Sequence, residues 1–313
     1  MGPVTIGASE MKVLPVRIAA LLCAAALLLL GACSEESPSP SSGGASGDSV
    51  PDNDTSPAKE ESESPAPPPV DAEESSRVTF ELWYTKGSSN RLTFTTVTQE
   101  STPKVGTAAL EALIAGPPAG SGKLTTAIPA DVTLNGLTID GGTATVDLSS
   151  SFEEGGGTAS MGMRLGQVTF TLTQFPTVQR VAFELDGKLV KVFSNEGLVI
   201  SKPLTRADFE DIAPPVTVDR PRSGDDVTSP VTISGTANVF EANVSIRIED
   251  ADGNVLTESF ATADCGTGCR GDYSRKVSFE VDEPTEATIV LFEQSAEDGS
   301  DLFPVGIPVT LLP

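Results

Sequence analysis

Apolar and polar residues alternate in short runs from Val78 onward, and glycine, proline, asparagine and aspartate separate the runs. A period of two directs alternate side chains to one face of an extended chain, so each run predicts a β-strand. In the first half the runs are 78–84, 92–95, 132–134, 137–139, 143–148, 181–185 and 189–193. In the second half they are 231–235, 244–248, 255–260, 277–281, 288–292 and 305–311. The even spacing of this second set is typical of a β-sandwich.

Three short segments between these runs have turn chemistry. Asp140-Gly141-Gly142 and Asp186-Gly187 each predict a hairpin, because glycine adopts the positive φ that tight hairpin turns require. Asp250-Ala251-Asp252-Gly253-Asn254 resembles the opening of a calcium loop. A calcium loop needs its glycine at the sixth position, whereas Gly253 stands fourth, so a hairpin turn is the favoured interpretation.

Two segments have the period of a helix. Ser101 and Thr102 are candidate N-caps, Pro103 suits a first turn, and Gly116-Pro117-Pro118 ends the helix. The apolar stripe between them consists of Val105, Ala109, Ala112 and Leu113. The second segment, 161–175, fits a helical face and a strand equally well, so the pattern alone leaves both open.

The N-terminus reads as a targeting signal. Residues 18–30 are almost entirely apolar, follow Lys12 and Arg17, and run into Leu29-Leu30-Gly31-Ala32-Cys33. A basic region followed by an apolar stretch of this length is typical of a signal peptide. The last five residues resemble the bacterial lipobox, in which a lipid is attached to the cysteine before cleavage. We therefore expect a signal peptide over 1–32 and a lipidated Cys33; a plain secretory signal is the alternative.

The next segment, 33–77, has almost nothing to bury. By count it contains 11 acidic and two basic residues among serine, proline and glycine. Low hydrophobicity with like charges does not offset the entropy lost on ordering, which predicts a disordered tether. Its expected role is a spacer between membrane and folded part, and a protein-binding acidic tail is the alternative.

Pro203, Pro214 and Pro215 mark 203–215 as a connection between a mixed α+β domain, 78–202, and an all-β domain, 216–313. The first resembles the GerMN domain of sporulation and spore germination proteins. The resemblance rests on 108–118, Ala127-Ile128-Pro129, 164–175 and 181–187. In that family the segment 164–175 is helical, so the resemblance implies a helix there.

The second domain resembles the immunoglobulin-like domain named for bacterial spore germination. The residues that carry this resemblance are 229–231, 235–244 and 253–256. Together the two resemblances imply an envelope location and a binding or assembly role. They imply no catalytic residues.

Composition excludes several functions. The chain has 313 residues, no histidine and a formal net charge of −24. Without histidine there is no Ser-His-Asp triad and no HExxH zinc site. Strong acidity argues against nucleic acid as a partner, since phosphate binding needs a basic face. Aromatic residues are only 5% of the chain, which argues against a ligand surface rich in stacking.

The remaining motifs favour structural interpretations. Cys265 and Cys269 lie four residues apart with two glycines between them, and outside the cytoplasm such a pair is expected to form a disulfide. Gly120-Ser121-Gly122-Lys123 departs from the phosphate-loop pattern and predicts a turn, and Gly155-Gly156-Gly157 predicts a mobile loop. Trp83 and Tyr84 point to opposite faces of a strand, so we expect at most one in the core, the other being a possible glycan platform.

Adjacent carboxylates such as Glu153-Glu154 and Asp225-Asp226 carry little weight among 44 acidic residues. The sequence thus indicates no catalytic, cofactor-binding or metal-binding residues. It predicts a lipid-anchored protein on the extracytoplasmic face of the cell membrane. We expect it to bind an envelope protein or cell-wall partner without catalysis, in envelope assembly or a germination-type process. A receptor that takes up glycan or peptide through the GerMN-like domain is the second hypothesis, and an enzyme acting on the cell wall is the third.

Overall fold

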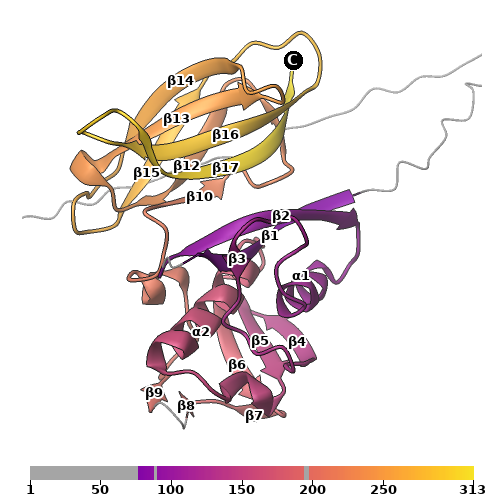
Figure 1. Ribbon diagram of the computed structural model, residues 1–313. Coiled ribbons are helices and arrows are strands. Elements are labelled where there is room, and N and C mark those ends of the chain that lie inside the picture. The colour runs from indigo at the N-terminus through magenta and orange to yellow at the C-terminus, as the bar shows by residue number, and fades with distance from the viewer. Residues whose placement is uncertain (1–76, 88–89, 194–196) are drawn as a thin grey trace, which may run out of the picture. The chain divides into compact units, whose positions relative to one another are not determined.

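The computed structural model describes residues 77–87, 90–193 and 197–313, all within one compact unit. The predicted signal peptide, Cys33 and the tether up to residue 76 lie outside the described residues. Within that unit an α+β domain is followed by an all-β sandwich, which confirms the predicted fold classes (Figure 1). In the described ranges, no helix has both the length and the apolar character needed to cross a membrane.

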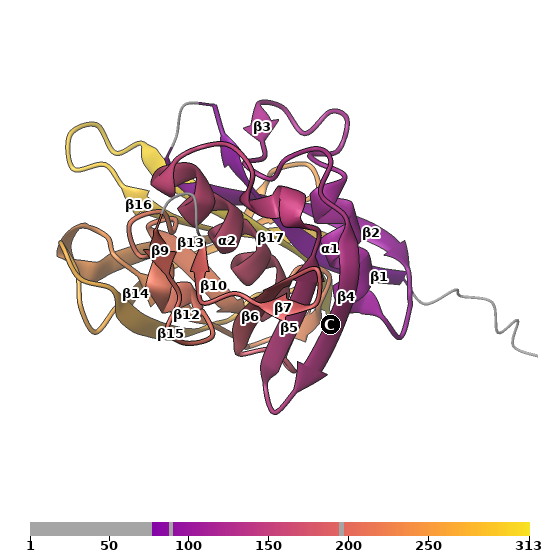
Figure 2. The same ribbon diagram turned by 90° about the horizontal axis from the view of Figure 1, so that it is seen from below.

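The α+β domain contains two sheets and a short hairpin (Figure 2). The first sheet has the order β2-β1-β3 and is antiparallel. Its strands are β1 (Arg77–Lys86), β2 (Leu92–Glu100) and β3 (Leu124–Thr125). The second sheet has the order β4-β5-β6-β7, with β5 and β6 parallel. Its strands are β4 (Leu134–Asp140), β5 (Thr143–Leu148), β6 (Arg180–Leu185) and β7 (Lys188–Leu189), and β8 (Val192–Phe193) pairs with β9 (Leu198–Val199).

Helices α1 (Val105–Ile114) and α2 (Thr158–Thr173) contact each other and β1, and they also contact β4 and β6 respectively. They therefore fill the space between the two sheets of this domain (Figure 1). Helix α2 covers 161–173 of the segment that the pattern left open, and it confirms the helix that the resemblance implies. It connects the parallel strands β5 and β6, as parallel pairing requires a long crossover.

Helix α1 begins later than expected. Its N-cap is Lys104, with no side-chain cap, so the prediction of Ser101 or Thr102 as the cap is wrong. Instead the Thr102 hydroxyl accepts a hydrogen bond from the Lys104 amide, at 3.2 Å. A threonine can satisfy a backbone donor in this local turn, and it then does not cap the helix.

Both aromatic residues of β1 are buried, which corrects the expectation that at most one lies in the core. Tyr84 has no exposed surface and Trp83 is 2% exposed. They do point to opposite faces, but neither face meets solvent. The Tyr84 hydroxyl lies 3.4 Å from the carbonyl of Ala112 in α1, while the Trp83 ring packs against Phe94 and Phe170. Neither is available as a glycan platform.

Side chains of α2 and of its C-cap residue Gln174 occupy the hydrogen-bonding positions of β1 that have no strand partner. The Gln174 amide binds both the N–H and the C=O of Glu81, at 2.7 and 2.8 Å. Thr171 accepts from the Trp83 N–H, and Gln167 donates to the Trp83 C=O. These polar residues recur at helical spacing and satisfy buried backbone groups that would otherwise destabilise the fold. This use explains polar residues in a buried helix.

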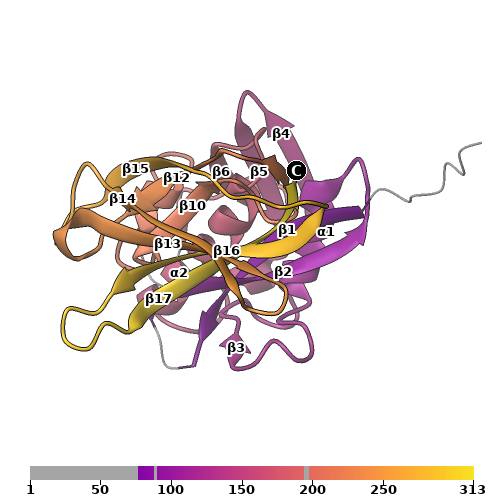
Figure 3. The ribbon, with the colours of Figure 1, turned by 90° about the horizontal axis from the view of Figure 1, so that it is seen from above.

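The sandwich consists of a sheet of order β10-β12-β15 and a sheet of order β11-β17-β16-β13-β14 (Figure 3). The strands are β10 (Val216–Arg220), β11 (Asp226–Thr228), β12 (Val231–Ala237), β13 (Asn243–Asp250), β14 (Val255–Thr262), β15 (Gly271–Val277), β16 (Thr285–Gln294) and β17 (Asp301–Leu312). The prediction of a strand over 277–281 is wrong, because β15 ends where that run begins. The buried positions of β15 are Gly271, Tyr273 and Val277, and the exposed Arg275 interrupts the alternation, so the sequence shows no apolar period there.

The segment 203–213, expected to be a plain connection, packs against the α+β domain. It contains the 3₁₀ turn η2 (Arg206–Phe209), and Phe209 and Ala213 belong to that domain's core. Helix α2 has Gly166 at this contact, where an added Cβ would come within 2.8 Å of the Ile212 Cδ1. The small residue therefore permits the close approach of 206–213 to α2.

Candidate functional site

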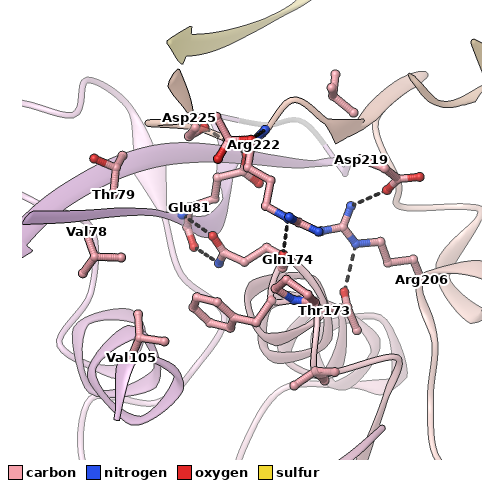
Figure 4. Close-up of a pocket in the computed structure, with 15 residues that line it drawn as sticks. Val78, Thr79, Glu81, Val105, Thr173, Gln174, Arg206, Asp219, Arg222 and Asp225 are labelled. Atoms are coloured by element: carbon pink, nitrogen blue, oxygen red, sulfur yellow. Dashed lines mark hydrogen bonds and ion pairs between the residues drawn. The ribbon is translucent and has the colours of Figure 1, made fainter. Parts of the chain in front are cut away.

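A cavity of about 420 Å³ lies where β1, α2 and η2 meet the segment 218–225 of the sandwich (Figure 4). Its polar lining includes two arginines and three carboxylates, and valines, Phe175 and Pro176 supply apolar walls. Cavities lined by apolar groups with a few convergent polar side chains are the usual form of small-ligand sites. This cavity is therefore the candidate functional site.

Glu81 is the most buried acid of the site. It is 7% exposed, and its two carboxylate oxygens accept from the Ser223 hydroxyl at 3.1 Å and the Trp83 indole N–H at 3.2 Å. Burial raises the pKa of this carboxyl above its usual value, against the opposing charge of Arg206. The bond to Ser223 links β1 directly to the sandwich.

Arg206 lies opposite Glu81 and is held from several sides. Its Nε donates to the Thr173 hydroxyl at 2.9 Å, and its guanidinium carbon lies 5.0 and 5.5 Å from the ring centres of Phe170 and Trp83. Its Nη1 is 3.8 Å from the carboxylate of Asp219. Burial lowers the pKa of Arg206, and the charges of Glu81 and Asp219 counteract that effect.

Arg222 enters the same cavity from the sandwich side (Figure 4). Its Nε donates to the Gln174 carbonyl at 3.0 Å, and its backbone N–H donates to Asp225 at 2.8 Å. The neighbouring Gly224 has φ +86°, and a Cβ there would come within 2.7 Å of the Thr79 Cβ. Gly224 thus allows the loop that carries Arg222 to lie directly on β1.

A second charged cluster joins the two domains beyond Arg206. Arg270 forms an ion pair with Glu210 and donates to the Pro214 carbonyl at 2.8 Å. Asn238 also donates to Glu210, at 3.1 Å. Burial raises the pKa of Glu210, but the hydrogen bonds from Arg270 and Asn238 outweigh it and hold the pKa below its usual value. A further cavity of about 420 Å³ lies between this cluster and Arg206.

Neither predicted cysteine lines a cavity, although Cys269 directly precedes Arg270, which lines the second one. The structure joins Cys265 and Cys269 in a disulfide, with the Cα atoms 5.8 Å apart, in the loop between β14 and β15. Thr267 and Gly268 in that loop donate to Val239 and Asn238. The disulfide loop is thus packed on a neighbouring loop of the sandwich, which fits a structural role.

The other motifs of the sequence are turns. Gly120 and Gly122 both have positive φ in the turn before β3. Asp250 accepts from the N–H groups of Asp252 and Asn254, as expected for a hairpin turn. In the described part of the chain, no group of acidic residues and cysteines is arranged to hold a metal ion.

Gly155-Gly156-Gly157 lies directly before α2. No sequence pattern indicated a role for Arg164, which is 4% exposed and donates to the carbonyls of Ala127, Phe152, Glu154 and Gly155. These bonds fasten the loop that was expected to be mobile.

No sequence pattern indicated Glu81, Arg206 or Arg222 as site residues either. Glu81 occupies a polar position in an alternating strand, and such a position usually faces solvent. The Ser223 hydroxyl that covers it is 142 residues away in the chain. The one available signal was that Arg206 and Arg222 flank the predicted start of the second domain.

Comparison with known families agrees with this architecture. Residues 81–191 match the family described as "Sporulation and spore germination", and residues 215–300 match the "Immunoglobulin-like domain of bacterial spore germination". Both resemblances drawn from the sequence are confirmed. No curated protein sequence matches the chain.

Solved structures that are similar in part include two of GerMN domains. The first GerMN domain of the sporulation protein GerM from Bacillus subtilis is 26% identical, with 42% of this chain and 99% of that chain covered and a TM-score of 0.37. The tandem GerMN domains of the same protein are 21% identical, with 65% and 62% covered and a TM-score of 0.39. Since both TM-scores are below 0.5, the assignment of the two domains rests on the family models.

Proposed function

Because the chain joins a domain of the sporulation and spore germination family to an immunoglobulin-like domain of bacterial spore germination, we propose that it is a lipid-anchored envelope protein that binds a protein or cell-wall partner and catalyses no reaction. The lipid is attached to Cys33, and the folded part acts on the extracytoplasmic side of the membrane. The acidic tether lets that part reach its partner.

One observation carries the binding role. The cavity at Glu81 is lined from both domains, and polar contacts across its walls, such as Ser223 to Glu81 and Arg222 to Gln174, hold those walls together. A preorganised site of this kind binds with little loss of conformational freedom. Its acidic and basic side chains converge between apolar walls, as is usual for a ligand-binding site.

The test of the binding role is capture of a partner. The full chain, purified in detergent, is immobilised and exposed to envelope extract and to purified cell-wall fragments. We expect saturable binding of a partner. Gly224→Val should weaken that binding, because a side chain at Gly224 displaces the cavity wall from Thr79. Gly253→Val, in a hairpin turn with nothing near its Cβ, is the control for a substitution at positive φ. The binding role is contradicted if both variants capture the partner as well as the native chain does, or if the native chain captures none. Release of soluble products from the cell-wall fragments contradicts the absence of catalysis.

The anchor is tested separately by detergent-phase partition and labelling with a fatty-acid analogue. Cys33→Ala should abolish the label and shift the protein to the aqueous phase, since acyl chains provide the expected anchoring. Cys23→Ala is a matched control, because Cys23 lies inside the segment that the signal peptidase removes. Retention of Cys33→Ala in the detergent phase would show that the anchor is not this lipid.

A further inference from the structure

The two arginines of the Glu81 cavity differ in what they contact. Arg206 is bonded to Thr173 and lies near Asp219 and the buried Glu81, so its charge is compensated. Arg222 uses its Nε for Gln174 and its backbone N–H for Asp225. Within the described ranges, neither terminal nitrogen of Arg222 has a hydrogen-bond or ion-pair partner. One guanidinium edge in the cavity is therefore available to a ligand.

A guanidinium edge is suited to one kind of group. Its two parallel N–H donors match the two oxygens of a carboxylate or phosphate, with a geometry that an ammonium does not offer. The cavity also contains Glu81, Asp219 and Asp225. These acids repel a phosphate dianion more strongly than a carboxylate monoanion, so the surroundings of Arg222 favour the carboxylate.

The rest of the lining indicates what the carboxylate is attached to. Val78, Val105, Val178 and Phe175 form apolar walls, which suit aliphatic groups next to the carboxylate. A volume of about 420 Å³ is at the small end of the range for ligand pockets, roughly 300–1,000 Å³. It holds the end of a peptide, whereas a folded partner as a whole does not enter.

We propose that this cavity binds the free C-terminal carboxylate of an extended peptide with small aliphatic terminal residues, through the terminal nitrogens of Arg222. This deepens the proposed function by naming the chemistry that the binding site recognises. The peptide end has two sources, a protein C-terminus or the stem peptide of the cell wall. Their carboxylate chemistry is the same, and they differ in the chirality of the last residues.

The experiment measures binding of short acetylated peptides to the full chain in detergent, by calorimetry or fluorescence anisotropy. The probes are acetyl-tri-L-alanine, an acetylated tripeptide ending in D-Ala-D-Ala, and the C-terminal amide of each. We expect at least one free acid to bind saturably and its amide to bind about tenfold or more weakly, because the amide lacks the charge that Arg222 pairs with. The acid that binds better identifies the source.

Arg222→Gln should weaken binding of the free-acid peptide by the same factor and leave binding of the amide peptide unchanged. Arg220→Gln is the control, because Arg220 is exposed, lies two residues away and does not line the cavity. If Arg222→Gln does not fold, the proposal is tested by peptide binding to Arg222→Lys and by comparing the affinities of the free acid and the amide for the native chain. Equal binding of acid and amide, or full affinity in a folded Arg222 variant, overturns the proposal. Partner capture without peptide binding refutes this ligand and leaves the proposed function standing.

Discussion

Replacement of Glu81 is the most direct test of how the two domains are joined. Glu81→Ala removes the acceptor of two buried hydrogen bonds, from the Ser223 hydroxyl and the Trp83 indole N–H. It also removes the carboxylate that faces Arg206. Glu81→Gln keeps one acceptor oxygen and the side-chain volume but removes the charge. The two variants therefore separate the hydrogen bonds from the electrostatics.

The size of the effect follows from these contacts. A buried donor left without an acceptor costs about 1–3 kcal/mol, and Glu81→Ala leaves two such donors. The Ser223 hydroxyl can rotate about its C–O bond, whereas the Trp83 indole N–H is fixed in a ring packed against Phe94 and Phe170. Removal of the carboxylate also relieves its own desolvation. We therefore expect Glu81→Ala to lower the free energy of unfolding by about 2–4 kcal/mol, and Glu81→Gln by about 1–2 kcal/mol.

The pH dependence has a definite sign. Burial raises the pKa of Glu81 above 4.5, so between 4.5 and the raised pKa the folded chain binds more protons than the unfolded chain. In that window the free energy of unfolding contributed by Glu81 falls as pH rises, and it is greatest below the window. Glu81→Gln has no such contribution. The stability difference between native chain and Glu81→Gln should therefore shrink with rising pH.

The assay is urea unfolding followed by tryptophan fluorescence, because Trp83 is the one tryptophan of the chain and lies beside Glu81. It is run from about pH 4.5 to about pH 8, which spans the window above the ordinary glutamate pKa. Glu111→Gln, at an exposed position of α1, is the matched control. A loss below about 1 kcal/mol for Glu81→Ala, or a constant difference between native chain and Glu81→Gln across pH, would refute this account.

Three further predictions concern the rest of the fold. Mass spectrometry without reduction should find Cys265 and Cys269 bridged, and replacing both by alanine should cost about 2 kcal/mol in thermal unfolding, the expectation for so short a loop; free thiols at both positions contradict it. Gly166→Leu should lower stability by about 1–3 kcal/mol through overpacking against Ile212, whereas Gly162→Ala, with nothing near its Cβ, should raise it by about 0.5–1 kcal/mol. Arg270→Gln should cost about 1–3 kcal/mol, and Lys276→Gln, exposed on β15, should be neutral.

Local pattern was sufficient for elements whose partners are close in the chain. The run 143–148 became β5 with those bounds, and Asp186-Gly187 forms the β6–β7 turn with both residues at positive φ. In each case the alternation or the turn chemistry depends on a few neighbouring residues. The helix α2 was different, because its Thr171 and Gln167 bond to β1 and not to solvent. The pattern therefore matched both a helix and a strand, and only the family resemblance indicated the helix.

The candidate site could not be predicted from local sequence patterns, because its residues are also brought together by long-range contacts. Whether Glu81 is buried depends on Ser223 and Arg206, which the fold brings to it from the second domain and from the segment before it. A proline-rich stretch such as 203–215 is typical of an exposed connection, but it has Phe209 and Ala213 to bury. When residues distant in the sequence bury a strand position, the hydrophobic pattern of the strand itself does not show it.

The two charged clusters at the junction differ in burial, and salt can separate them. Glu81 is 7% exposed, whereas the side chain of Glu210 in its ion pair with Arg270 is 41% exposed. Mobile ions screen exposed charges over about 10 Å at 0.1 M and about 3 Å at 1 M, but they reach buried groups poorly. The cost of Arg270→Gln should therefore shrink in about 1 M NaCl, while that of Glu81→Ala persists. Urea unfolding of both variants at low and high salt measures this, and an equal response of the two would show that the clusters do not differ in solvent access.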